Sequence, residues 1–146
     1  QFNILERKID FKWSEKRFAE EHKNATREIM AIESHNIPDE VLEYKGIQLP
    51  ELPKEFELID TRKRLFEEGK IMSHCVYTNY YENIKNNRFV VYHVNYKDEE
   101  ATLGLDYSNE ELTFNQLKKR YNHSPSTEMK NFVNQYFRIG IVDYVL

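Results

Sequence analysis

The chain is poor in cysteine, glycine and proline. Its 146 residues include one cysteine, four glycines and four prolines. A single cysteine excludes an intrachain disulfide and a cysteine-rich zinc site, and so few glycines and prolines argue against long flexible linkers. The length suits one core with an appended helical segment and is too short for two full domains.

Long apolar runs and an overall positive charge are also absent. No apolar run approaches the roughly 20 residues that span a bilayer, and the amino end lacks the apolar core of a signal peptide. We therefore expect a cytoplasmic protein without a membrane partner. The net charge of −4 argues against a uniformly basic coat for nucleic acid. Positive charge gathers in residues 116–146, where five cations and two carboxylates give +3 and leave −7 for the rest.

The amino-terminal third of the chain predicts a long helix and a connector. Ser14 can cap a helix that runs to Glu33, and this helix could contact a protein partner through residues 14–33. Its apolar stripe recurs at steps of three and four residues: Phe18, His22, Ala25, Ile29 and Ile32. Residues 36–56 hold three of the four prolines and read as a connector. We therefore place residues 1–56 apart from a domain at residues 57–146.

The remaining sequence predicts helices around an antiparallel sheet. One helix should begin at Asp60 or Thr61 and end at Gly69, and a second should follow Cys75 and end at Asn86. Three strands and a last helix follow: Phe89–Tyr96, Thr102–Tyr107, Glu111–Gln116, and a helix that starts near Ser124–Ser126; a short strand near Tyr44–Leu49 precedes them all. The predicted fold class is α+β, a small antiparallel β-meander packed with flanking helices and preceded by the long amino-terminal helix.

Two distant segments carry the most distinctive pattern. The stretch Glu67–Val76 contains Met72, Ser73, His74, Cys75 and Val76, and it precedes a tyrosine-containing helix. About 40 residues later come Gln116, Asn122 and Pro125, separated by six and three residues. Together with the apolar strand at 89–94 and Thr102 on the next strand, this pattern resembles the PcfJ-like proteins.

The resemblance covers Leu58 to Tyr136, a little over half the chain. It implies an association with conjugative plasmids, phages and related mobile elements, and it implies no particular reaction. The sequence departs from the family pattern at several positions. Tyr77 and Thr78 stand where small residues are usual, Lys119 replaces a usual glycine, and Gly104 stands where an acidic residue often follows the threonine.

His74 and Cys75 suggest nucleophilic chemistry, in which an imidazole lowers the pKa of a thiol. Adjacent side chains point in different directions and rarely serve each other. We therefore favour a structural interpretation in which Cys75 packs in the core. The five histidines show no close ligand spacing, so we expect no metal site and no cofactor.

The second candidate site is polar and basic. Gln116, Asn122 and His74 could line a polar cluster that reads a base edge or holds a nucleotide, or they could satisfy backbone groups in a turn. Beside them, Lys118, Lys119 and Arg120 could neutralise phosphates and Tyr121 could stack on an unpaired base, although three charges in a row also suit a solvated loop.

Three functions follow from these candidates. The first is a non-catalytic, nucleic-acid-associated accessory domain of a mobile element that binds through the basic, amide-rich turn. The second is a nuclease or transferase that uses His74 as general acid or base, with Cys75, Gln116 and Asn122 in the same site. The third is a protein-interaction module that uses residues 14–33.

Overall fold

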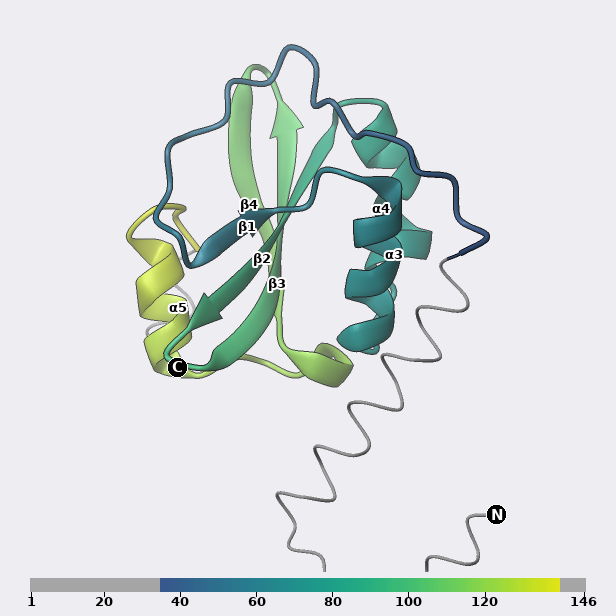
Figure 1. Cartoon of the computed structure of the whole chain (residues 1–146). Helices are drawn as coiled ribbons and strands as arrows, with labels where there is room; N and C mark the ends of the chain where they lie inside the picture. The colour runs from purple at the N-terminus through teal and green to yellow at the C-terminus, as the bar shows by residue number, and fades with distance from the viewer. Residues whose placement is uncertain (1–34, 140–146) are drawn as a thin grey trace, which may run out of the picture. The chain divides into compact units, whose positions relative to one another are not determined.

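The computed structural model describes residues 35–139, so the predicted helix from Ser14 to Glu33 lies outside the described residues. The described part forms an α+β unit (Figure 1), which confirms the predicted class: a four-stranded antiparallel meander with three α-helices. The elements are β1 (Phe56–Leu58), α3 (Arg62–Ile71), α4 (Val76–Lys85), β2 (Phe89–Tyr96), β3 (Glu99–Ser108), β4 (Glu111–Lys118), the 3-10 turn η1 (Arg120–Asn122) and α5 (Thr127–Asn134).

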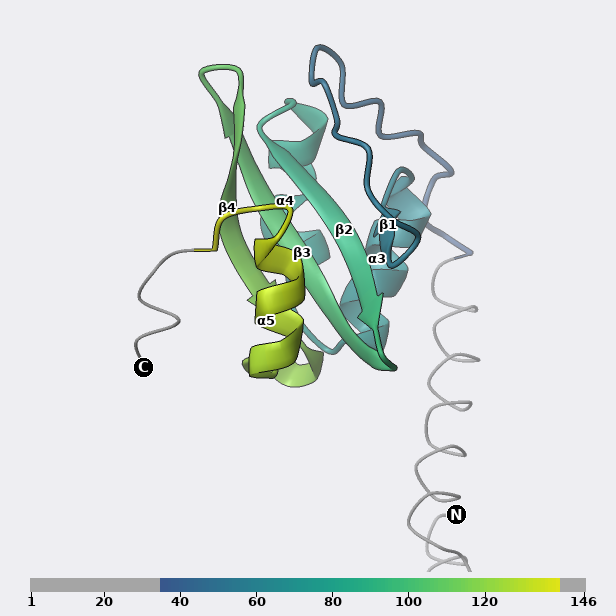
Figure 2. The same ribbon diagram turned by 90° about the vertical axis from the view of Figure 1, so that its left-hand side faces the viewer.

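The sheet separates two layers of helix, with α3 and α4 on one face and α5 on the other (Figures 1 and 2). Its strand order is β1-β2-β3-β4. Alternate residues of β2 serve opposite faces, since Phe89 stacks on Tyr80 of α4 while Tyr96 stacks on Phe132 of α5, each at 4.1 Å between ring centroids. This double coverage explains why the strand is apolar on nearly both faces.

The same alternation brings four residues of β3 and β4 to the α3–α4 face. Thr102 pairs with Lys118 and Gly104 pairs with Gln116, before a bulge shifts the register between Gly104 and Leu105. Thr102 contacts Glu68 of α3, which identifies the face. The sheet therefore presents Gln116 and Lys118 toward the helices that carry the His74–Cys75 pair.

Two helix starts have the expected caps. The Thr61 side chain accepts a hydrogen bond from the Arg64 amide, and the Ser126 side chain accepts one from the Met129 amide. The predicted end of α3 at Gly69 is wrong, because the helix continues to Ile71. Gly69 is instead a site of close approach, where a Cβ would lie 3.2 Å from the backbone oxygen of His74.

The proline-rich segment before β1 belongs to the same compact unit, which begins at Ile37. Leu42, Tyr44 and Ile47 are buried, and the Tyr44 hydroxyl donates to the Ile59 carbonyl at 2.7 Å. No strand forms over residues 44–49, where Tyr44 and Gly46 have positive φ values of 51° and 78°. The short strand lies later, at β1, where the sequence analysis predicted none.

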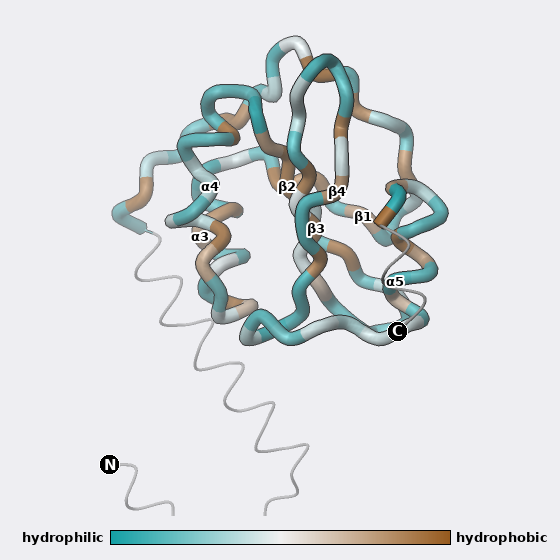
Figure 3. The backbone as a smooth tube through the Cα atoms, turned by 180° about the vertical axis from the view of Figure 1, so that it is seen from behind, coloured by the Kyte–Doolittle hydropathy of each residue, from teal (hydrophilic) through white to brown (hydrophobic). Residues whose placement is uncertain are grey.

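Hydrophobic residues concentrate in the strands, while the tip of the β3–β4 hairpin is hydrophilic (Figure 3). Among the fully buried side chains are Phe89, Val91, Leu103 and Leu105 of the two central strands and Met129 of α5. Within residues 35–139, no helix combines the length and the apolar character that a membrane span needs.

Gly104→Ala should destabilise the fold by about 1–3 kcal/mol, the usual cost of overpacking a core. A Cβ at this position would lie 2.5 Å from Cζ of Phe89, whose buried ring is held against Tyr80. Urea unfolding measures the loss. Phe89→Leu removes the clashing ring atoms, so the double variant should be more stable than the sum of the two single losses predicts. Strict additivity would contradict this packing.

Candidate functional site

The loop between α3 and α4 carries the His74–Cys75 pair. It is a tight connection, because α3 ends at Ile71 and α4 begins at Val76. Ser73 adopts a positive φ of 53°, and the His74 amide donates to the Gly69 carbonyl at 3.0 Å. The reversal directs the two neighbouring side chains to different surroundings.

Cys75 is exposed, so the interpretation that it packs in the core is wrong. It occupies the cap position just before α4 and makes no side-chain capping bond. Its neighbours Met72 and Val76 fill the interior instead, with 1% and 2% exposure. The preference of cysteine for burial is overruled here by the geometry of the helix start.

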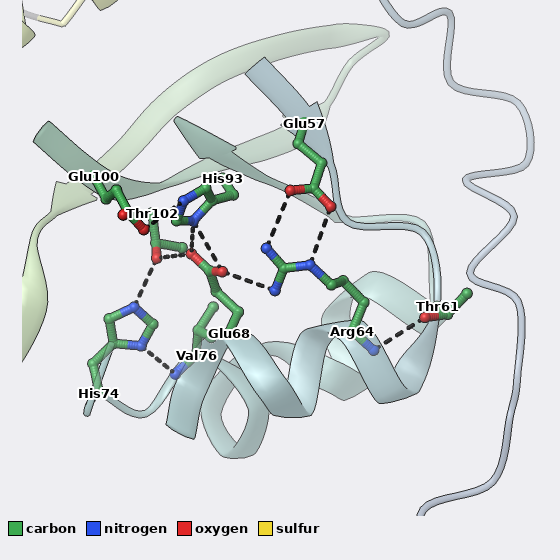
Figure 4. Close-up of polar contacts among 9 residues, drawn as sticks. All are labelled: Glu57, Thr61, Arg64, Glu68, His74, Val76, His93, Glu100 and Thr102. Carbon is green, nitrogen blue, oxygen red and sulfur yellow. Dashed lines mark hydrogen bonds and ion pairs between the residues drawn. The ribbon is translucent and has the colours of Figure 1, made fainter. Parts of the chain in front are cut away.

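The His74 ring is held by hydrogen bonds at both nitrogens (Figure 4). The Val76 amide donates to Nδ1 at 3.4 Å, so Nδ1 is the unprotonated nitrogen. Nε2 then carries the proton and donates to Oγ1 of Thr102 at 2.8 Å, and the Thr102 hydroxyl donates to the carboxylate of Glu68. This relay favours one neutral tautomer. Burial, only partly opposed by the charge of Glu68, lowers the pKa of His74 and keeps the ring neutral near pH 7.

Glu68 is the centre of a buried charged network that the sequence analysis missed (Figure 4). It is 1% exposed, and its carboxylate receives His93 Nδ1 at 2.8 Å and Arg64 Nη1 at 3.0 Å. The other nitrogen of His93 lies 3.2 Å from Glu100, and the guanidinium of Arg64 also makes a paired contact with Glu57. The spacing of Glu68 in the sequence was a signal for this network. Glu68 follows the buried Leu65 by three residues and precedes the buried Met72 by four, so its charge lies on the core face of the helix.

Glu68 and His93 are both ionised in this network. Burial alone would raise the pKa of Glu68, but the hydrogen bonds and charges of His93, Thr102 and Arg64 outweigh it and hold that pKa below its ordinary value. Burial opposes protonation of His93, yet its hydrogen bonds to Glu100 and Glu68 raise its pKa to about 9. A protonated His93 therefore faces an ionised Glu68 at neutral pH.

A pocket of about 350 Å³ between α4 and β4 brings together five of the predicted site residues, and we call it the α4–β4 pocket. Its lining includes His74, Cys75, Gln116, Lys118 and Asn122, together with Val76, Asn79 and Tyr80 of α4. The Tyr121 amide donates to the Met72 carbonyl at 2.8 Å, and this bond holds η1, with Asn122, beside the α3–α4 loop. Residues some 40 positions apart in the sequence thus share one surface.

The three cations of the predicted basic run, Lys118, Lys119 and Arg120, have different surroundings. Lys118 borders the α4–β4 pocket, whereas Lys119 lies just beyond β4 with its Nζ 4.0 Å from Glu99, which also accepts bonds from Ser126 at the start of α5. Tyr121 is 55% exposed and does not line the pocket. Arg120 is half-buried and has no ion pair with a described residue.

A second, more apolar pocket of about 500 Å³ shares His74 and Cys75 with the α4–β4 pocket and extends along α3 and the start of α4. Phe66, Gly69, Lys70, Ser73, Tyr77 and Thr78 complete its lining. Across residues 35–139, no three His, Cys, Asp or Glu side chains are grouped so that they could hold a metal ion.

Comparison with known proteins adds no relative: no model of a protein family, no curated protein and no solved structure matches the chain.

The stability of the domain should fall as the pH rises from about 6.5 to about 9. His93 has a raised pKa in the folded state, so its stabilising contribution is complete below 6.5 and is lost as the pH passes about 9. The shift corresponds to about 3 kcal/mol at most. Glu68 and His74, with lowered pKa values, titrate below this range. Urea unfolding across the range measures the fall, and His93→Gln should remove most of it.

His123→Gln is the matched control, because His123 is exposed and lies outside the network. This variant should keep the pH dependence of the wild type. An equal slope in the wild type and in His93→Gln would mean that His93 does not titrate against Glu68.

Proposed function

We propose that this domain is a non-catalytic, nucleic-acid-associated accessory domain of a mobile genetic element, and that it binds through the α4–β4 pocket. One observation carries the proposal: Gln116, Lys118 and Asn122 line a single pocket while their side chains make no hydrogen bond or ion pair with the described residues. Two amides and a cation with unused hydrogen-bonding capacity suit a ligand that has polar edges and negative charge. The mobile-element context rests on the resemblance to PcfJ-like proteins.

The state of His74 favours binding over catalysis. Its Nε2 proton is committed to Thr102, its Nδ1 accepts the Val76 amide, and its lowered pKa leaves it uncharged. The groups that remain available around the pocket are hydrogen-bonding amides and the Lys118 ammonium. In this proposal His74 is a positioning residue that fixes the wall of the pocket.

The proposal divides the basic run by role. Lys118 contacts a phosphate at the pocket, whereas Arg120 does not line the pocket and supplies no phosphate contact in this proposal. Lys119 is assigned to Glu99, whose carboxylate also accepts hydrogen bonds from Ser126 at the start of α5. The whole chain has a net charge of −4, and in this proposal it binds through a local contact rather than through a broad basic surface.

Lys118→Glu should weaken binding to short oligonucleotides at least about tenfold, because it replaces an attraction to phosphate by a repulsion. The melting temperature should change little, since Lys118 has no ion-pair partner among residues 35–139. Fluorescence anisotropy at moderate salt measures the affinity.

Lys54→Glu is the control for net charge. Lys54 is exposed and precedes β1, at the sheet edge opposite β4. Lys54→Glu makes the same change in net charge as Lys118→Glu. Because Lys54 lies at the opposite edge of the sheet, the affinity for oligonucleotides should stay nearly unchanged. Equal losses in the two variants would point to nonspecific charge attraction and would count against the pocket.

The relay at His74 supports a second candidate, a nuclease or transferase on nucleic acid or nucleotide. A neutral imidazole whose far nitrogen is oriented by Thr102 and Glu68 has the arrangement of a general base, and its Nδ1 makes only a long contact of 3.4 Å. The exposed Cys75 lies beside it. The third candidate, a protein contact through residues 14–33, concerns residues outside the described range and stays a prediction.

Incubation of single- and double-stranded DNA and RNA with magnesium, followed by gel analysis, separates the first two candidates. The binding proposal expects no product. The enzymatic candidate predicts a product with the wild type and none with His74→Gln. This variant retains a hydrogen-bond donor toward Thr102, and its binding to oligonucleotides should persist. Product formation by the wild type would replace the accessory function with the catalytic one.

A further inference from the structure

The α4–β4 pocket is small and concave. Its volume of about 350 Å³ lies near the lower end of the range of about 300–1,000 Å³ for small-molecule sites. Proteins that read a base-paired duplex place a protruding helix or β-ribbon into a groove. The α4–β4 pocket is a recess between a helix and a strand and presents no such projection. It therefore suits a ligand group that inserts into the pocket.

The proposed binding residues Gln116, Lys118 and Asn122 come from two elements, β4 and η1, whose backbones are held by hydrogen bonds. Gln116 and Lys118 lie two residues apart on β4 and pair with Gly104 and Thr102 of β3. Asn122 follows the end of β4, in η1, which the Tyr121 amide ties to the carbonyl of Met72 at the end of α3. Each amide offers a donor and an acceptor side by side, which is the pattern that recognises the edge of a nucleobase.

Gly104 has a part in shaping this surface. Because it lacks a side chain, the ring of Phe89 lies over its Cα, and the Cγ of Gln116 is the next nearest neighbour of a Cβ built there, at 3.4 Å. Phe89 in turn stacks on Tyr80, with ring planes within 6° of parallel. Tyr80 therefore enters the pocket wall as a rigid aromatic group, which suits contact with a flat base.

The number of cations at the pocket indicates how many phosphates can bind there. Lys118 is the only cation among the described residues that line the pocket, and Lys119 is directed to Glu99. Binding along a duplex usually neutralises several phosphates. A single cation beside two amides and a tyrosine matches one nucleotide.

We infer that the α4–β4 pocket takes a single unpaired nucleotide, with its base at Gln116, Asn122 and Tyr80 and its phosphate at Lys118. The inference rests on the proposed nucleic-acid function and specifies its ligand as single-stranded rather than duplex. A Watson–Crick edge can reach recessed amides only when the base is unpaired or displaced from its stack. Single-stranded DNA and RNA share this chemistry.

The test uses the full chain and fluorescence anisotropy. Probes are short single strands of mixed sequence in DNA and in RNA, their blunt duplexes, and homopolymers of A, C and T or U. The single strands should bind at least about tenfold more tightly than the duplexes, and free nucleoside monophosphates should compete. A preference for the DNA or the RNA strand identifies the source of the nucleotide, and both results support the inference.

Two variants separate base contacts from phosphate contacts. Gln116→Ala should weaken binding to one homopolymer more than to the others, because it removes a contact to a base edge. Lys118→Gln should weaken all of them alike and lower the salt slope by about 0.7. Gln135→Ala, an exposed glutamine at the end of α5 on the other face of the sheet, should change neither.

The contrary outcomes are distinct. If duplexes bind as tightly as single strands and Gln116→Ala behaves like Gln135→Ala, the inference is overturned while the proposed function stands. If no oligonucleotide binds at any salt concentration, the proposed function fails and the inference fails with it.

Discussion

The buried carboxylate of Glu68 is the interaction on which the rest of this domain depends. An ionised carboxylate with 1% exposure is costly to bury, and here the cost is offset by a protonated histidine, an arginine and a threonine hydroxyl. These partners come from α3, β2 and β3, so one side chain joins α3 to the centre of the sheet. Loss of one partner from such a network usually costs about 3–5 kcal/mol, because an uncompensated charge remains buried.

The same carboxylate determines the state of the candidate site. Through the Thr102 hydroxyl it selects the tautomer of His74, and His74 in turn receives the first amide of α4. The start of α4, the α3–α4 loop and the near end of β4 are thereby placed around one pocket. His74 thus belongs both to the buried network and to the proposed binding surface. Its ring is fixed in one orientation because both of its nitrogens make hydrogen bonds.

The basic run shows how the fold gives neighbouring residues different roles. Lys118, Lys119 and Arg120 are consecutive and look equivalent in the sequence. Lys118 ends β4 on the face of the pocket, while Lys119 reaches a carboxylate near α5 and Arg120 begins the 3-10 turn. Alternation along a strand separates charges that a linear pattern groups together. The electrostatic character of the site is therefore that of one local cation between amides.

The sequence by itself determined the fold class and most of the elements, but neither β1 nor the irregular course of residues 44–49. The strand at residues 89–96 and the helix starts predicted at Asp60 or Thr61 and near Ser124–Ser126 rest on local signals, and the structure has a strand and two capped helices there. The sequence left two interpretations of His74, Gln116 and Asn122, a polar cluster or groups that satisfy a turn, and in the structure all three line one pocket. Only the tertiary structure decided the exposure of Cys75, the continuation of α3 past Gly69, and the protonation of His93 against Glu68. Those properties depend on contacts between residues distant in the chain, where burial and opposing charge outweigh the intrinsic preference of any single residue.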